Sequence, residues 1–400
     1  MTSRVAAATA ETFRELASER RLLAHLDDEI LRAQIEVAQI AAPTGAERQR
    51  ARWMAERFGA EGLTARVDEE GNVVSRAPGA YADAPVVVCA HLDTVFPAET
   101  KLEIRRDGRR VVGPGICDNS RGLAVMLVLA RVVQRCRTGF ARPVEFVATT
   151  GEEGAGDLRG AKHYFANGRT PFAVVALDGA GDERIVNTAL GSRRFRIEYH
   201  GPGGHSWSAF GAPNPVHAAA RATTGLASLR FEGAGRAALS VSRIGGGMSV
   251  NSIPEDAWLE VDARSTRDAT LARFEREVRE IACAAASAEN QRRMPGTPSL
   301  TYKVTRIGDR PSGQTAEDAA LVVAAVEATR LVGRTPELAT ASTDANAAIG
   351  LGAPAIAIGG GGQGGDAHSS REWFDNSAST AGVERALTII ATMARLAADD

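Results

Sequence analysis

Short runs rich in apolar, β-branched residues recur in the first half of the chain, and helix-like stretches separate them. The runs cover residues 86–90, 144–148 and 173–177, and a proline lies just before each of them. A strand with such a run has both faces buried, as in sheets that are covered by helices. Apolar residues at helical spacing over 122–134 and 157–165 predict the intervening helices. The sequence therefore predicts an α/β fold with a mixed sheet between layers of helices.

Helical spacing also marks the beginning of the chain. Apolar residues recur with this period from about Glu11 to Phe58, with an interruption at residues 42–45, which predicts two or three opening helices. Thr44, followed three residues later by Glu47, matches a capping box, in which each side chain accepts a backbone N–H at the start of a helix. We therefore expect a helix to begin there.

The pattern changes near Gly191. Polar and apolar residues alternate over 194–199, as in a half-exposed antiparallel strand. The segment up to residue 308 then continues as helix, strand, strand, helix and strand. Such a β-α-β-β-α-β series forms a small open sheet with helices on one face. This part of the chain is thus predicted to be a separate α+β domain.

After Pro311 the buried α/β pattern resumes, with a helix over 318–331 and an apolar strand over 353–358. The α+β segment is therefore predicted to be an insertion. We expect residues 1–190 and 309–400 to form one domain and residues 191–308 to form the other.

Composition and charge exclude several kinds of partner. The formal net charge of -2 provides no cationic surface for nucleic acid or an anionic membrane. The four cysteines form no Cys-x-x-Cys pairs, which is typical of reduced thiols. The N-terminal segment lacks the apolar core of a signal peptide, and the apolar run over 123–130 is too short to span a membrane. We therefore expect a cytoplasmic protein that acts on a small molecule.

Histidine and acidic residues lie at the ends of the predicted strands or in the loops that follow them. Singly, they are equally consistent with helix caps, acidic turns and surface histidines. Together they fall where open α/β sheets bind ligands, and the donor set suits zinc, with more ligands than one ion needs. Two ions joined by a carboxylate lie ~3.5–4 Å apart and share one activated water. The residues are His91, Asp93, Asp118, Glu152, Glu153, Asp178 and His368.

In their order along the chain, these residues resemble a family of cocatalytic two-zinc hydrolases. It includes carboxypeptidase G, peptidase T, acetylornithine deacetylase, succinyl-diaminopimelate desuccinylase, aminoacylase and carnosinase. The resemblance extends from about Asp27 to the end of the chain. It implies a zinc exopeptidase-like catalytic domain with an inserted lid. The matching motifs are His91-x-Asp93, Gly115-x-x-Asp118, Gly151-Glu152-Glu153-Gly154, Asp178 and Ala367-His368.

The resemblance implies a role for each site residue. His91 and Asp178 would bind one ion, Glu153 and His368 the other, and Asp118 would bridge them. The ions would be zinc, with manganese and cobalt as alternatives. Glu152 would be the general base, which takes a proton from water and passes it to the leaving nitrogen. Strand periodicity places Asp93 beside His91, where it can orient the imidazole. The resemblance also implies a cis peptide bond between Asp118 and Asn119.

The inserted domain carries further candidates. His205 matches a lid histidine that stabilises the oxyanion and, in dimers of the family, reaches the neighbouring subunit's site. Asn251 and Arg264 match groups that hold a substrate carboxylate, for which a guanidinium is well shaped. No phosphate-loop spacing follows the glycine-rich segment around Gly361, so we interpret it as a backbone wall beside the substrate. A homodimer through the lid is expected, with its strand over 194–199 or its helix from Val216 at the interface.

These residues predict a metal-dependent hydrolase that cleaves the amide or peptide C–N bond of a small substrate bearing a carboxylate, such as a short peptide or an N-acyl amino acid. An alternative is an aminohydrolase that deaminates a small non-peptide compound at the same two ions. A binding protein on an inactive hydrolase scaffold is disfavoured, because both Glu152 and Glu153 are present.

Overall fold

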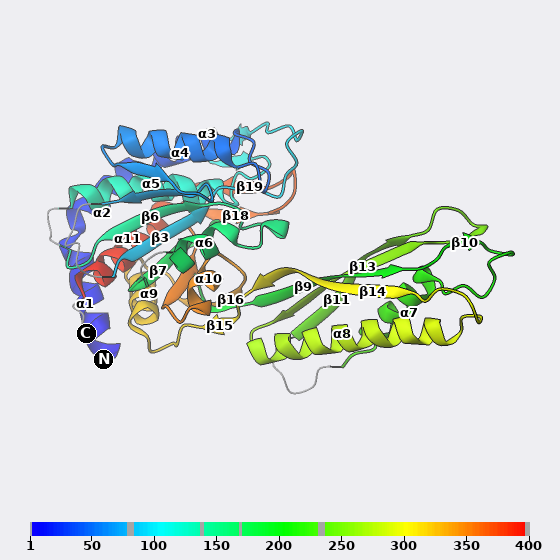
Figure 1. Cartoon of the computed structure of the whole chain (residues 1–400). Helices are drawn as coiled ribbons and strands as arrows, with labels where there is room; N and C mark the ends of the chain where they lie inside the picture. Colours follow the sequence, from blue (N-terminus) through cyan, green and yellow to red (C-terminus); the bar gives the residue numbers. More distant parts are fainter. Residues whose placement is uncertain (1, 78–83, 137–139, 168–169, 231–236, 397–400) are drawn as a thin grey trace. The chain divides into compact units, whose positions relative to one another are not determined.

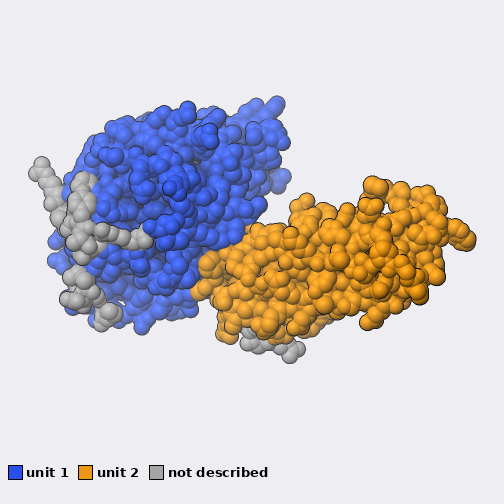
Figure 2. All heavy atoms as spheres, in the orientation of Figure 1, with its two compact units in different colours: residues 1–189, 314–400 blue, residues 190–313 orange. Residues whose placement is uncertain are grey.

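The computed structural model describes residues 2–77, 84–136, 140–167, 170–230 and 237–396, which form two compact units (Figure 1). Unit 1 comprises Met1–Ala189 and Gln314–Asp400, and unit 2 comprises Leu190–Gly313. Figure 2 draws them in blue and orange. The chain therefore leaves unit 1 once, builds unit 2 and returns. None of the described helices is long and apolar enough to cross a membrane.

Unit 1 contains most of the helices and the central sheet. Its helices are α1 (Thr2–Glu15), α2 (Ala17–His25), α3 (Asp27–Ala38), α4 (Arg48–Ala60), α5 (Ser120–Arg135), α6 (Arg159–Asn167), α9 (Ala320–Leu331), α10 (Ala345–Gly350) and α11 (Thr380–Arg395). The strands of its central sheet are β1 (Ala65–Val67), β2 (Val73–Arg76), β3 (Val86–His91), β6 (Val144–Thr149), β7 (Ala173–Leu177), β8 (Arg184–Ala189), β15 (Gly313–Gln314), β16 (Glu337–Ala341) and β17 (Ala355–Ile358). A smaller sheet consists of β4 (Arg105–Asp107), β5 (Arg110–Val112), β18 (Gln363–Gly365) and β19 (Trp373–Asp375).

Among the described residues the central sheet has nine strands, in the order β1-β2-β6-β3-β7-β17-β8-β15, with β16 paired to β8. Neighbours from β6 to β17 are parallel, whereas β2 with β6 and β17 with β8 are antiparallel. The predicted mixed sheet is thus confirmed. The three apolar runs form β3, β6 and β7, which lie side by side at its centre.

Strand β3 shows why this sheet needs helices on both faces. Val86 and Val88 belong to the apolar core that includes residues of α5 and α11. Val87 and Cys89 belong to a second core, which includes residues of α6 and α10. Because successive side chains of a strand point to opposite faces, an apolar run of this kind is buried only between two helix layers.

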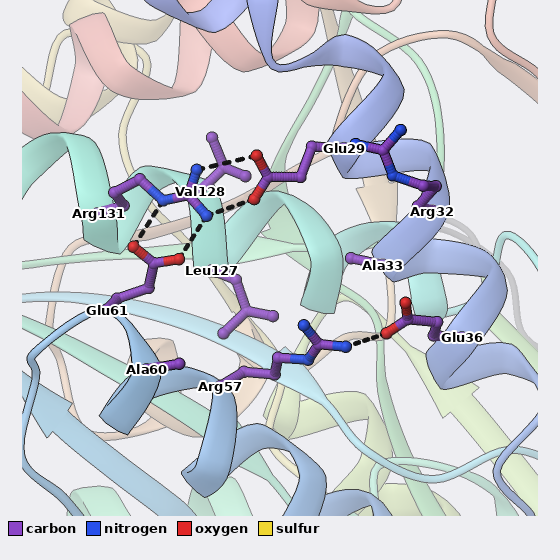
Figure 3. A pocket seen from close by; sticks show the side chains of 10 residues that line it. All are labelled: Glu29, Arg32, Ala33, Glu36, Arg57, Ala60, Glu61, Leu127, Val128 and Arg131. Carbon is purple, nitrogen blue, oxygen red and sulfur yellow. Dashed lines mark hydrogen bonds and ion pairs between the residues drawn. The ribbon is translucent and has the colours of Figure 1, made fainter.

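Ion pairs hold together the outer helices that cover the sheet (Figure 3). Arg131 of α5 donates from Nε to Glu61 Oε2, which follows α4, at 2.6 Å, and from Nη1 to Glu29 Oε2 of α3 at 3.0 Å. Nearby, Arg57 of α4 pairs with Glu36 of α3. Only 15% of the Arg131 side chain is exposed, so these pairs are partly shielded from water. The network therefore joins three helices around a small surface pocket.

Unit 2 is an antiparallel sheet with two helices packed on it. It contains β9 (Gly191–His200), β10 (Gly204–His205), α7 (Pro215–Ala227), β11 (Ala237–Gly246), β12 (Ser252–Ile253), β13 (Asp256–Ser265), α8 (Asp268–Gln291) and β14 (Thr301–Arg310). The sheet order is β11-β13-β9-β14, and β10 pairs with β12 in a separate short ribbon. One core joins apolar residues of β9 and β13 to those of α7 and α8. This is the predicted element series, with the short ribbon added.

The predicted capping box is wrong. Helix α4 begins at Arg48, and its N-cap residue Glu47 makes no side-chain cap hydrogen bond. Instead, Glu47 Oε1 accepts the backbone N–H groups of Gly45 and Gly151, at 2.8 and 3.1 Å. The Thr44 hydroxyl donates to Asp93 Oδ2 at 2.8 Å. Both side chains thus hold loops at the end of the central sheet, which a local sequence pattern does not reveal.

Candidate metal centre

The predicted ligands meet at one edge of the central sheet. His91 is the last residue of β3, Glu152 and Glu153 follow β6, and Asp178 follows β7. These strands are parallel neighbours, so their carboxyl ends lie together. Asp118 lies just before α5, and His368 lies between β18 and β19 of the smaller sheet. His368 has a φ of +64°, in the left-handed region that few non-glycine residues adopt.

Asp118 lies between the two histidines. Its Oδ1 is 3.0 Å from His91 Nε2, and its Oδ2 is 3.1 Å from His368 Nε2. His368 Nε2 is also 2.9 Å from Glu153 Oε1. One carboxylate therefore faces two imidazoles from different parts of the chain, each with a different oxygen.

These residues fit a divalent cation. His91, Asp118 and Glu153 each offer one ligand atom, and the three atoms lie within 4.8 Å of one another. Asp118 Oδ1 is buried and has no hydrogen bond of acceptable geometry, although His91 Nε2 is close to it. A buried carboxylate oxygen without a well-aligned hydrogen bond is unfavourable, and a cation would satisfy it. The donor set of imidazole and carboxylate is the one that zinc and similar ions prefer.

The protonation of the histidines reflects the surrounding negative charge. Burial disfavours the charged form of His91, but its contact with Asp118 and the charges of Asp118 and Asp93 raise its pKa well above the ordinary value. The hydrogen bond with Asp118 raises the pKa of the more exposed His368 to about 9, and Glu153 adds to the shift. Both imidazoles must be neutral to bind a cation, so metal binding would displace their protons.

Two of the carboxylates have raised pKa values, whereas an ion pair ordinarily lowers the pKa of an acid. Burial and the charge of Asp118 raise the pKa of Asp178 to about 7. Burial likewise raises the pKa of Glu153, and Asp118 contributes to the shift. These acids are thus crowded and repel one another. Nearby dications would reverse the balance and favour their charged forms.

Asp93 is fully buried, and its carboxylate holds the loop that carries Glu152 and Glu153. Asp93 Oδ1 accepts the N–H of Glu152 and Oδ2 accepts that of Glu153, both at 2.9 Å. His91 Nδ1 lies 3.1 Å from the Asp93 carbonyl oxygen but 3.6 Å from its carboxylate. Asp93 therefore lies beside His91, as the strand spacing predicts, with its carbonyl nearer to the imidazole than its carboxylate.

Asn119 connects two of the site loops, a role that the sequence analysis missed. Its Oδ1 accepts the N–H groups of Gly122 and Gly179, at 3.1 and 3.2 Å. Its Nδ2 donates to the carbonyl of Leu177 at 2.9 Å. Asn119 thus caps α5 and joins the Asp118 loop to the end of β7. Its position just before a helix was the available signal. The Asp118–Asn119 peptide bond is cis, as the resemblance implies.

An open surface cleft of about 620 Å³ includes two residues of the cluster in its lining, and its size suits a small ligand. Asp118 and Asp178 line it on one side, and residues 362–365 of the glycine-rich segment line it on another. Gly361 is buried against α11, where an added Cβ would lie 2.0 Å from the Ser379 carbonyl oxygen. The glycine that we predicted at the substrate is therefore a packing glycine, and its neighbours face the cleft.

The remaining predicted residues belong to unit 2. His205 is exposed in β10, and its Nδ1 accepts the N–H of Trp207 at 3.1 Å. Asn251 Oδ1 accepts the hydroxyl of Ser249 at 2.8 Å. Arg264 donates from Nε to Asp262 Oδ2 at 2.6 Å, an ion pair within β13. All three retain polar atoms at the surface of their own unit.

Comparison with known proteins gives relatives of the same architecture. A crystal structure of aminopeptidase PepT from Bacillus cereus has a TM-score of 0.73 at 21% identity, with 92% of this chain and 99% of that chain covered. Bacillus subtilis YxeP, a dinuclear metal-binding peptidase of the M20 family, has a TM-score of 0.66 at 18% identity, with 92% and 98% covered. At these identities the similarity shows the shared fold.

A curated protein of Aeropyrum pernix, whose name is that of a LysW-lysine/LysW-ornithine hydrolase, is 30% identical over 233 residues. The match covers 58% of this chain and 61% of that protein, so it spans about three fifths of the relative's length. Residues 87–395 match peptidase family M20/M25/M40, and this range contains all the predicted metal ligands. The matched family is one of peptidases, and the described residues include a His, Asp and Glu group that could hold a metal ion. The chain belongs to peptidase family M20/M25/M40.

Proposed function

We propose that this protein binds two divalent ions, bridged by Asp118, and hydrolyses the amide or peptide bond of a small substrate that carries a free carboxylate. In this proposal His91 and Asp178 hold one ion, and Glu153 and His368 hold the other. The ions are zinc, with manganese or cobalt as alternatives. The observation that carries the proposal is the position of Asp118, whose two oxygens face two histidines at 3.0 and 3.1 Å.

When bound, the ions supply Lewis acidity, which polarises the scissile carbonyl and makes a water nucleophilic at neutral pH. The side chains of the chain then move the protons. The Glu152 carboxylate takes a proton from the attacking water and passes it to the leaving nitrogen, so that the C–N bond breaks and an acid and an amine are released. The hydrogen bond from the Glu152 N–H to the fully buried Asp93 supports this role, because it fixes the main chain that carries the base.

The substrate class is supported by the cleft beside Asp118 and Asp178, which has room for a dipeptide or an N-acyl amino acid. Arg264 and Asn251 are the proposed partners of the substrate carboxylate, and His205 is the proposed donor to the oxyanion. The relative from Aeropyrum pernix is named for substrates that carry lysine or ornithine, which supports an amino-acid leaving group.

A combined metal and product analysis tests the proposal. The metal-free protein would be loaded with Zn²⁺, Mn²⁺ or Co²⁺ and incubated with dipeptide and N-acyl amino acid libraries, with products identified by mass spectrometry. The proposal predicts two ions per chain and products in which each substrate is split into an acid and an amine. Release of ammonia with the carbon skeleton intact would identify an aminohydrolase instead, and a loaded protein without turnover would contradict both.

A further inference from the structure

Glu372 lies four residues after His368, and its side chain is fully buried. Its carboxylate accepts three backbone N–H groups from the loop that leads to Asp118. Oε1 accepts those of Cys117 and Asp118, both at 2.7 Å, and Oε2 accepts that of Gly115 at 3.1 Å. One buried carboxylate thus fixes the main chain at both ends of residues 115–118.

The main chain of Glu372 is fixed to the same region. Its carbonyl accepts the N–H of Gly113 at 2.8 Å, and its own N–H donates to the carbonyl of Ser369 at 3.1 Å. Directly after it, β19 pairs with β5, with Trp373 opposite Val112. The segment with His368 and the segment with Asp118 are therefore joined by strand pairing, by main-chain hydrogen bonds and by the Glu372 carboxylate.

This connection matters because neither Asp118 nor His368 lies in a strand of the central sheet. His91 is in β3 and is fixed by the sheet itself, whereas 53% of the His368 side chain is exposed. The position of His368 relative to Asp118 therefore depends on the contacts between their two segments. The Glu372 carboxylate accepts three of the hydrogen bonds that join these segments.

A buried carboxylate beside Asp118 also has an electrostatic cost, because two negative charges repel each other. An apolar residue would avoid that cost. Arg50 of α4, which is 1% exposed, offsets part of it, since its positive charge acts on Asp93, Glu372 and Asp118. Arg50 donates to the carbonyls of Ile40 and Leu92, at 2.9 and 3.0 Å, and so also holds the chain next to His91.

We propose that Glu372 is a positioning residue that holds the Asp118 main chain opposite His368, so that the ion assigned to His368 and Glu153 has its ligands in place. This inference rests on the proposed two-ion function. Partners that orient metal ligands change metal affinity by ~10–100-fold when they are replaced. Asp118 is assigned to both ions, but the ion assigned to His91 and Asp178 keeps two ligands at the ends of β3 and β7. The loss should therefore be larger for the ion assigned to His368 and Glu153.

The test replaces Glu372 by Gln, which keeps the size but turns one acceptor oxygen into a donor. The Gln amide can take two orientations. In one its NH₂ group faces the N–H of Gly115, and in the other it faces those of Cys117 and Asp118, so at least one hydrogen bond is lost in both. A matched control is Glu145→Gln, since Glu145 is a buried glutamate of β6 that contacts Tyr164 and Arg76. Metal-free proteins would be titrated with Zn²⁺ against a chromophoric chelator, and Co²⁺ absorption would report on the ligand geometry.

The wild-type and Glu145→Gln proteins are expected to bind two ions with the same affinities. Glu372→Gln is expected to keep one tight ion and to bind the other ~10–100-fold more weakly, with an altered Co²⁺ spectrum and activity restored at high metal concentration. A folded Glu372→Gln protein that binds both ions with wild-type affinity would overturn the inference. If the wild type itself binds fewer than two ions, the proposed function fails instead.

Should Glu372→Gln not fold, Glu372→Asp provides the same test. It keeps the charge but is one methylene shorter, so it cannot reach all three N–H groups at once. We expect weaker binding of the same ion, by a smaller factor than for Gln. Wild-type affinity for both ions in a folded Glu372→Asp protein would overturn the inference equally.

Discussion

Asp118 and His368 are 250 residues apart in the sequence, yet His368 Nε2 lies 3.1 Å from Asp118 Oδ2. All of unit 2 lies between them in the chain. The cluster is therefore complete only after the segment from Gln314 onward has packed on the first part of unit 1. Metal binding to such a cluster stabilises the folded state, because the unfolded chain does not hold the ligands together.

Replacing Glu152 by Gln separates catalysis from metal binding. The change removes the proposed base but none of the proposed ligands. Turnover is expected to fall by ~10²–10⁴-fold, while the number of bound ions stays the same. Steady-state kinetics and metal analysis of the same preparation check this. A parallel loss of ions would show that Glu152 is a ligand, and undiminished turnover would exclude it as the base.

Metal affinity should increase with pH. In the ion-free protein His368 has a pKa of about 9 and Asp178 a pKa of about 7, and both must lose protons before they can bind a cation. Affinity is therefore expected to fall as the pH decreases below 9 and further below 7, with release of protons on binding. Calorimetry of Zn²⁺ binding at pH 7, in buffers with different ionisation enthalpies, measures that release. A binding enthalpy independent of the buffer would contradict it.

The same shift of Asp178 predicts how bound ions change stability. Its folded pKa of about 7 is above the unfolded value of about 3.9, so its contribution to stability is present below about pH 4 and is lost as the pH rises through 7. Ions reverse this by favouring the charged carboxylate. The increase in Tm on adding Zn²⁺ should therefore be larger at pH 8 than at pH 6, and less pH-dependent in Asp178→Asn. An equal increase at both pH values would argue against Asp178 as a ligand.

Arg131 provides a test of stability away from the cluster (Figure 3). Arg131→Met keeps much of the apolar length of the side chain but leaves Glu29 and Glu61 without their shared partner. Because the pair is partly buried, we expect a loss of about 1–3 kcal/mol in the free energy of unfolding. Urea denaturation measures it, and metal content should not change. A loss within error of zero would show that the pairs are no stronger than exposed ones.

His205 is proposed to complete the site of a second chain in a homodimer. Glu152→Gln and His205→Ala chains, each inactive, would be mixed under conditions that exchange subunits. In a mixed dimer one site receives an intact Glu152 from one chain and an intact His205 from the other, so activity should return. Mixed dimers that form, bind metal and stay inactive would show that His205 acts in its own chain or not at all.

The sequence predicts those parts of the fold whose signals are local. The runs that form β3, β6 and β7 are buried on both faces, so their composition alone indicates central strands. In contrast, β16 carries exposed residues at several positions and has no such pattern. It pairs in parallel with β8 across a long sequence separation, which local periodicity does not reveal.

In the site, too, residues with a local sequence signal are predicted and residues with distant partners are not. His91, Asp118, Glu153 and His368 are found by residue type at strand and loop positions, and the structure brings them together. The roles of Glu47 and Glu372 are missed, because both accept backbone N–H groups from loops far away in the sequence. A glutamate in such a position has no local signature, and its partner becomes visible only in the folded chain.

If Asp118 bridges two ions, the spins of two bound Mn²⁺ ions should couple through its carboxylate. The metal-free protein would be loaded with Mn²⁺, the bound ions counted, and the EPR spectrum recorded for the wild type and Asp118→Asn. Asn has a single acceptor oxygen, so it cannot present an oxygen to both ions. We predict two ions per wild-type chain with a spin-coupled spectrum, and loss of the coupling with at most one tightly bound ion in Asp118→Asn. A wild-type chain that binds one ion, or two ions without coupling, would show that Asp118 does not bridge two ions.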